Sequence, residues 1–219
     1  MKYFRVGLFL LIVLTIIPAC TIVKHESQEK QSTGELEIYF SDSGFDPRAY
    51  VASIWEEKVL PCIDKRAADI AEVLSALKAS EGEASKKYGY RLGNEGTFYN
   101  FAVKGKVKIL HVNTESRNGL AYVDVAPFDG KEDCLIQIGP VFKGTSIRDM
   151  LDFISLNSFA NQVEFARLAS ELNARVREKV IGPIDPAAMA GKMYSMTAVF
   201  TLDGTSALPL LTPVVLVGE

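Results

Sequence analysis

The chain is predicted to fold as a mixed α+β domain in which three strands, a helical segment and two more strands follow one another. β-branched residues dominate residues 101–138, and strand-like texture returns over 193–202 and 214–217. A stripe of apolar residues at helical spacing separates the two β regions. A further helical segment, over residues 46–80, is expected to precede the first strand.

The N-terminus has the pattern of an exported protein. Lys2 and Arg5 precede a nearly all-aliphatic run, Val6 to Ile17, which ends in Pro18-Ala19-Cys20. The run is short for a membrane span, which needs about 20 apolar residues, but it matches the apolar core of a secretory signal. A small residue directly before a cysteine resembles the lipobox of bacterial lipoproteins, so Cys20 is the expected lipidation site. The alternative is an uncleaved N-terminal anchor with an incidental cysteine.

Lipidation at Cys20 would divide the chain into three parts. Residues 1–19 are then a signal peptide, residues 20–34 a polar tether, and residues 35–219 a single domain of ordinary size. The mature protein would be attached to a membrane through its acyl chains and would face the periplasm or the cell exterior. Its formal charge is −5, against −3 for the whole chain. An acidic, exported protein is not expected to bind nucleic acid.

Two cysteines remain in the predicted domain, Cys62 and Cys134. An extracytoplasmic compartment permits a disulfide between them. Two separate buried thiols are the favoured alternative, because sequence gives no distance between the two residues.

The region before the β segment predicts one short strand and two helices. Leu36–Phe40 has the texture of a strand, and Asp46-Pro47 is typical of a helix start. Pro61 is expected to interrupt the first helix, in which Trp55 is predicted to anchor the core. A second amphipathic helix is expected, with its apolar face at Ile63, Ala67, Ile70, Leu74 and Leu77.

Residues 101–138 predict a three-stranded meander. The first strand is expected to bulge near Gly105, and its lysines at 104, 106 and 108 alternate onto one face, as in a protected edge strand. Asn118-Gly119 and Asp129-Gly130 are the expected turns, and the third strand begins at Cys134.

Helices are expected to resume after the meander. Ser146 and Asp149 have capping-box spacing, and a longer helix is predicted from about Ser158 to a stop at Gly182-Pro183. The full order of elements is that of an OB-fold, a five-stranded, partly open barrel with a helix between its third and fourth strands. A plain α+β sandwich with the same order is the structural alternative.

Several motifs resemble a family of predicted periplasmic lipoproteins of unknown function. They are the lipobox and, in order along the chain, Phe45-Asp46-Pro47, Ile54-Trp55, Ile136–Val141, Gly144-Thr145 with Arg148-Asp149, and Asn161-Gln162 with Glu164. The resemblance covers nearly the whole mature chain. It implies an OB-fold, the fold of a structurally known member. It also implies an association with sugar-importing ABC transporters, whose genes often lie beside those of the family.

Two groups of residues are candidate ligand contacts. The free backbone N–H groups at a helix start, with the nearby cations, could hold an anion. Amides projecting into a barrel mouth could bind sugar hydroxyls. In both cases a purely structural role is the preferred alternative. The candidate residues are Lys143, Gly144, Thr145 and Arg148 in the first group and Asn161, Gln162 and Glu164 in the second.

No HExxH, CxxC or GxSxG pattern is present, and His111 is the one histidine of the predicted domain. No metal or cofactor is therefore expected. The favoured interpretation is a non-enzymatic, lipid-anchored binding or accessory module, associated with ABC-transporter components or with a sugar ligand. Two alternatives stay open: an envelope enzyme acting on glycans, and a docking scaffold that binds no small ligand.

Overall fold

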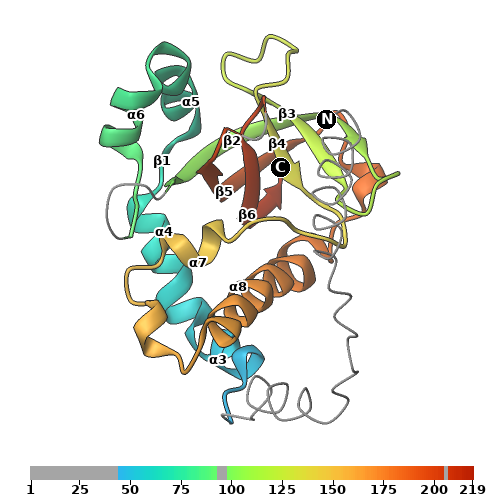
Figure 1. The fold of residues 1–219 in the computed structure, drawn as a ribbon. Helices are drawn as coiled ribbons and strands as arrows, with labels where there is room; N and C mark the ends of the chain where they lie inside the picture. The colour runs from blue at the N-terminus through green and yellow to red at the C-terminus, as the bar shows by residue number, and fades with distance from the viewer. Residues whose placement is uncertain (1–43, 93–97, 205–206) are drawn as a thin grey trace, which may run out of the picture. The chain divides into compact units, whose positions relative to one another are not determined.

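The strands of the computed structural model pair into one six-stranded sheet (Figure 1). The structure describes residues 44–92, 98–204 and 207–219. Neighbouring strands follow the order β1-β2-β3-β4-β6-β5, and β2 pairs with β5 as well, so five strands form a ring of pairings. The strands are β1 (Ala68–Asp69), β2 (Tyr99–Asn113), β3 (Leu120–Val125), β4 (Cys134–Gln137), β5 (Met193–Leu202) and β6 (Leu210–Gly218).

Two pairings give the ring its topology. The long strand β2 pairs antiparallel with β5 over residues 99–108 and with β3 over residues 107–113. Strand β4 pairs in parallel with β6, with Leu135 opposite Leu210 and Ile136 opposite Leu211. The three predicted strands of the meander and the two later strands are therefore all present, in the predicted order.

Helices precede the ring and connect its third and fourth strands (Figure 1). Helix α7 packs on strands β2 and β5, whereas helix α3 packs on helix α8. The helices are α3 (Pro47–Ile54), α4 (Leu60–Arg66), α5 (Ile70–Ala79), α6 (Glu81–Tyr88), α7 (Ser146–Met150) and α8 (Gln162–Val176). Shorter turns are the π-helical η1 (Trp55–Val59) and η3 (Arg177–Ile181) and the 3-10 turns η2 (Leu156–Ser158) and η4 (Pro186–Ala188).

The predicted boundaries of the first two helices were wrong, although the Asp46 cap predicted for the first helix was right. The Asp46 carboxylate accepts hydrogen bonds from the first free N–H groups of α3. Pro61 does not end the helix, because the chain changes to a π-helical turn at Trp55–Val59 and then continues as α4. The second predicted helix is instead divided by β1, after which the Asp69 side chain caps α5.

One later cap prediction and two later predictions of a helix or strand start also need correction. Ser146 begins α7, as predicted, but the cap position is Thr145, whose hydroxyl bonds to Asp149. Helix α8 begins at Gln162 rather than near Ser158, because Asn161 supplies its cap. Strand β6 begins four residues before Val214. Pro213, which discourages a strand prediction, lies beside an irregularity in the β5–β6 register.

The lysines of β2 lie on the outer face of a strand that is paired on both sides, so the prediction of an edge strand was wrong. Lys104 bonds to Asp64 and Lys106 to Glu219, both at 2.8 Å. The irregular register falls between Ile109 and His111, not at Gly105. Gly105 serves another purpose: a Cβ there would come within 2.9 Å of Ile70, so the glycine lets α5 approach β2.

A pair of glycines, Gly119 and Gly139, lets the β2–β3 turn lie against the end of β4. A Cβ on Gly119 would lie 2.6 Å from the Cα of Gly139, and one on Gly139 would lie 2.5 Å from the backbone of Asn118. The Gly119 carbonyl accepts hydrogen bonds from the Ile138 and Gly139 N–H groups. The predicted Asn118-Gly119 turn is thus confirmed, and the two backbones touch where only glycine fits.

The core fills the inside of the ring and extends under the helices. Phe101 of β2 and Phe200 of β5 are opposite one another, stacked with ring centroids 4.9 Å apart, and both are fully buried. Trp55 is 2% exposed, which confirms it as a core anchor. Ile147, Met150 and Leu151 carry the core from the sheet to α7.

The predictions for the N-terminal region lie outside the described residues. They are the signal peptide 1–19, lipidation of Cys20, the tether 20–34 and the strand at Leu36–Phe40. Among the helices of the described ranges, none is long and apolar enough to cross a membrane.

Phe200→Ala is expected to lower the free energy of unfolding by about 3–5 kcal/mol, because it opens a cavity in the β2–β5 core and removes the stacked pair. Val217→Ala is the matched control on the neighbouring strand. Since Val217 is 58% exposed, its replacement should cost less than about 0.5 kcal/mol. Urea denaturation measures both, and equal costs would contradict the proposed core.

Candidate functional site

The connection between β4 and α7, where the first group of candidate residues lies, is held by buried amides. The Gln137 side chain, 2% exposed, accepts a hydrogen bond from the Lys143 N–H at 2.6 Å and donates to the Lys143 carbonyl at 3.1 Å. It also donates to the Thr212 hydroxyl at 2.8 Å. The Asn173 amide donates to the Gly144 carbonyl at 3.0 Å. The backbone of Lys143 and Gly144 is therefore fixed from inside the protein.

Thr145 and Arg148 direct their polar groups to one carboxylate. Asp149 accepts the Thr145 hydroxyl at 2.5 Å and the Arg148 guanidinium at 2.7 and 2.8 Å. The guanidinium carbon lies 3.9 Å from the centroid of the Phe165 ring, which adds a cation–π contact. An incoming anion would have to displace Asp149 from both partners, and α7 itself is only five residues long.

The second group of candidate residues builds the start of α8. The Asn161 side chain accepts the Glu164 N–H at 2.9 Å, and the Glu164 carboxylate accepts the Ala160 N–H at 3.1 Å. Asn161 thus caps α8, while Glu164 accepts from the residue before the cap. This is a variant of the capping box, in which the Glu or Gln would accept from the N–H of the cap residue itself. Gln162, the first residue of the helix, is exposed.

The structure does not gather the seven candidate residues into one site. Gly144, Thr145 and Arg148 line a hollow against α8. Glu164 lines another hollow with Phe45 and Phe159. Lys143, with Gly144 again, lines a third hollow on the side of α5.

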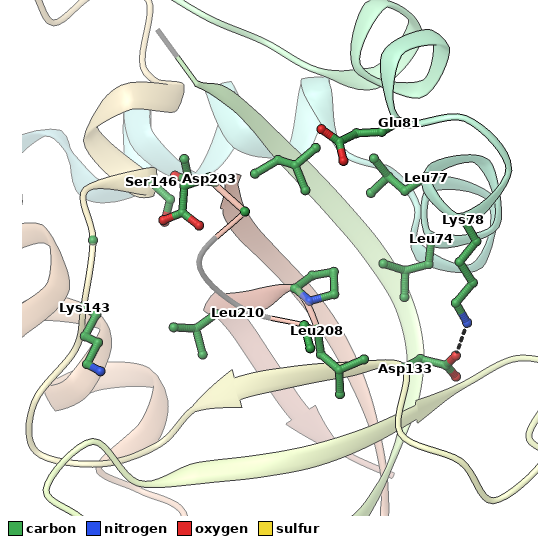
Figure 2. A pocket seen from close by; sticks show the side chains of 16 residues that line it. Leu74, Leu77, Lys78, Glu81, Asp133, Lys143, Ser146, Asp203, Leu208 and Leu210 are labelled. Carbon is green, nitrogen blue, oxygen red and sulfur yellow. Dashed lines mark hydrogen bonds and ion pairs between the residues drawn. The ribbon is translucent and has the colours of Figure 1, made fainter.

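This third hollow, the aliphatic pocket, has a volume of about 410 Å³ and lies between α5 and the connection from β5 to β6 (Figure 2). Its walls are largely aliphatic, and Figure 2 shows leucine side chains converging on it from both segments. The apolar lining is Leu74, Leu77, Leu202, Ala207, Leu208, Pro209 and Leu210. The polar or glycine lining is Lys78, Glu81, Asp133, Lys143, Gly144, Ser146, Thr201, Asp203 and Gly204.

Each wall of the aliphatic pocket is fixed by packing elsewhere. Ile70, Val73 and Leu74 bury the inner face of α5 against the sheet, which leaves Leu77 at the mouth. On the floor, Thr201 donates a hydrogen bond to Asn100 at 2.6 Å. Lys78 of α5 bonds to Asp133, just before β4, at 2.6 Å, so the helix is tied to the sheet at the pocket (Figure 2).

Cys62 and Cys134 do not form the disulfide that the sequence permits; both are free thiols. Cys134 lies fully buried on β4, where burial raises the pKa of its thiol to about 12, and the nearby Asp133 charge adds to the shift. Cys62 is half-buried on α4, with its sulfur 3.2 Å from a guanidinium nitrogen of Arg66. The two thiols therefore belong to separate environments, as the favoured alternative had it.

His111 and the acidic side chains do not form a recognisable constellation in the described ranges. The His111 ring stacks on Tyr122 at 4.1 Å, and its Nε2 lies 3.5 Å from a Glu132 oxygen on the surface. No group of three or more His, Cys, Asp or Glu side chains in the described segments is arranged to hold a metal ion.

Comparison with known proteins places this architecture in a family. The model of a family described as "Predicted periplasmic lipoprotein (DUF2291)" matches residues 10–217. The chain belongs to this family. Its members' description agrees with the resemblance found in the sequence motifs, which is thereby confirmed. No curated protein matches the chain.

This member of the DUF2291 family also resembles a solved structure. The crystal structure of an OB-fold protein from Thermotoga maritima MSB8 superposes with a TM-score of 0.65 and 21% sequence identity. The match covers 80% of this chain and 99% of the other. At that identity the likeness concerns the fold alone, and it supports the OB-type order of elements predicted from the sequence.

Sequence reasoning missed the residues that matter most around these sites. Gln137 stood inside the noted Ile136–Val141 motif, but alternation alone could not show that its side chain binds the Lys143 backbone. Leu77 and Leu210 have the pattern of ordinary core residues, and nothing local indicates that a pocket separates them. The periodicity of α5 was the one signal that could have drawn attention to this face.

Asn161→Ala is expected to lower the free energy of unfolding by about 1 kcal/mol, because it removes the cap of α8. Gln162→Ala, one position away on an exposed side chain, should change it by less than about 0.5 kcal/mol. Chemical denaturation of the two variants tests this. Unchanged stability of Asn161→Ala would return that residue to the list of ligand contacts.

The thiols give a second prediction, tested in a chain carrying Cys20→Ser so that only two cysteines remain. At pH 8 to 10 a thiol reagent should label Cys62 in the folded protein. Cys134 should react only on unfolding, because its pKa of about 12 keeps it protonated and its sulfur is shielded. Mass spectrometry of labelled peptides locates the label. If neither residue reacted until a reductant was added, a disulfide would be indicated.

Proposed function

We propose that the protein is a non-enzymatic accessory module of the cell envelope, anchored by acyl chains on Cys20 and associated with a sugar ABC uptake system. The signal and lipobox support the anchor, and the family description supports an envelope location. The gene neighbourhood implied by the family resemblance supports the link to sugar uptake. The five-stranded ring is, in this proposal, an OB-type barrel that carries the binding surface.

The observation that carries the binding role is the aliphatic pocket. Its volume of about 410 Å³ is within the range of small-molecule sites, and it joins apolar walls to a few polar groups. It also lies at the β5–β6 connection, one of the two loop regions from which OB-folds bind their ligands. Of the residues predicted from the sequence as ligand contacts, Lys143 and Gly144 line this pocket. Thr145 and Arg148 are bonded to Asp149, and Asn161 and Glu164 hold the start of α8, which leaves this pocket as the better candidate.

The chemistry of the pocket argues against the sugar itself as the ligand. A hexose carries hydroxyl groups around its ring, and each one buried without a partner costs roughly 2–7 kcal/mol. The leucine and proline part of the lining offers no such partners. Among the polar lining residues, Lys78 and Asp133 are bonded to one another and Thr201 is bonded to Asn100. The link to sugar uptake is therefore assigned to an accessory role, in which the pocket binds something other than the transported solute.

Deletion of the gene in the native host should lower the uptake of a sugar carried by an ABC importer. The intact gene should restore uptake, whereas Cys20→Ser, which removes the anchor, and Leu77→Asp, which places a charge at the pocket mouth, should not. Val217→Asp, a similar change at an exposed strand position, is the matched control and should restore uptake.

Radiolabelled sugar uptake is the measurement, with immunoblots confirming equal amounts of each variant. Unchanged uptake of every such sugar after deletion would contradict the accessory role. Full restoration by Leu77→Asp would contradict a role for the pocket.

A further inference from the structure

One hydroxyl at the wall of the aliphatic pocket has no hydrogen-bond partner among the described residues. It belongs to Ser146, a residue that is 5% exposed and whose side chain lines the pocket (Figure 2). Its oxygen is not among the polar atoms that are fully shut off from solvent, so it faces the open pocket. The neighbouring Thr145 hydroxyl, by contrast, is bonded to Asp149. A hydroxyl that faces a cavity without a partner from the protein is a group to which a bound molecule can hydrogen-bond.

The rest of the lining restricts what that molecule can be. Leucines of α5 face leucines of the β5–β6 connection, and no aromatic ring is among the described lining residues. Flat ligands such as nucleobases are held by stacking on aromatic rings, so the pocket is poorly suited to them. Branched aliphatic walls suit a flexible hydrocarbon chain, at roughly 25 cal/mol for each Å² of apolar surface buried.

The charges around the pocket do not call for a charged ligand. Lys78 and Asp133 neutralise one another at 2.6 Å. Lys143 and Glu81, of opposite sign, are both exposed at the rim and remain hydrated. Asp203 also lines the pocket, and Figure 2 shows its carboxylate near Ser146, where it would repel an anionic head group. Asp203 is exposed and already has an interaction partner, so it offers no unpaired charge to a cationic head group.

From these observations we infer that the pocket binds an uncharged aliphatic amphiphile. Its hydrocarbon chain lies between Leu77 and Leu210, and its hydroxyl or carbonyl head hydrogen-bonds to Ser146. This inference rests on the proposed binding role and specifies the ligand class for it. Neither the family description nor the OB-fold likeness assigns such a ligand.

The test uses the full chain with Cys20→Ser, so that its own acyl chains cannot compete. Five probes are compared. 1-Hexanol has an uncharged head group, hexanoate an anionic one and hexylammonium a cationic one, all on the same six-carbon chain. n-Hexane has the chain without a head group, and glucose has hydroxyl groups without the chain. Binding is followed by NMR of the leucine methyl groups. 1-Hexanol should bind tightest of the water-soluble probes and shift the methyl signals of Leu77 and Leu210, while glucose should shift none.

Ser146→Ala should weaken 1-hexanol binding about two- to tenfold, the effect of losing one hydrogen bond, and should not weaken n-hexane binding. Ser85→Ala is the matched control, because Ser85 is equally buried at 5% exposure but lies outside the pocket lining. It should leave both affinities unchanged.

Three results would overturn the inference: no binding by any probe, tighter binding of glucose or of either charged probe, or unchanged 1-hexanol affinity in Ser146→Ala. They differ from failure of the proposed function. If Leu77→Asp abolished sugar uptake while 1-hexanol did not bind, only the ligand class would be wrong. If 1-hexanol bound but deletion left uptake unchanged, only the accessory role would be wrong.

Discussion

The pairing of β2 on both sides is the constraint on which the rest of the structure depends. This strand is 15 residues long, and Val107 and Lys108 pair with β5 and with β3 at once. The first part of β2 pairs with β5 and its last part pairs with β3, so β2 links β5 back to the meander and completes the ring of pairings. The stacked rings of Phe101 and Phe200 fill the interior at the β5 side of this junction.

The same strand determines where the aliphatic pocket lies. The short strand β1 pairs with Val103 and Lys104 of β2, and α5 follows directly from it. Gly105 allows Ile70 to rest on the strand. Helix α5 is thereby held beside the end of β5, and Leu74 and Leu77 face the described residues of the β5–β6 connection across the aliphatic pocket. The aliphatic pocket is a consequence of attaching helices to an OB-type ring.

The strands could be predicted from the sequence because the features that indicate them lie within a few residues of one another. Alternating β-branched residues and the Asn118-Gly119 turn do not depend on distant contacts, and neither does the Asp46 cap. The division of the second helix by β1 was not predictable in this way, because it depends on pairing with a strand about 35 positions later in the chain. Pro61 misled for a related reason, since a π-helical turn can carry a helix past a proline.

The site was harder to predict than the fold. Polar residues in a motif-rich segment suggested ligand contacts, yet Gln137, Asn173 and Asp149 use those groups to hold the chain. The pocket joins α5 to residues more than 120 positions later, and its leucines have no sequence feature that separates them from core. The sequence predicted Ser146 as a helix cap. Only the structure shows that its hydroxyl has no hydrogen-bond partner among the described residues and faces the pocket.

The separate thiols have a consequence for the conditions under which this fold persists. No covalent cross-link joins the described helices to the sheet. The contact between them rests on packing, on Gly105 and on ion pairs such as Lys78 with Asp133. The described part of the fold is therefore held together without a disulfide. An oxidant in its surroundings would meet the half-buried sulfur of Cys62 first, because Cys134 is fully buried.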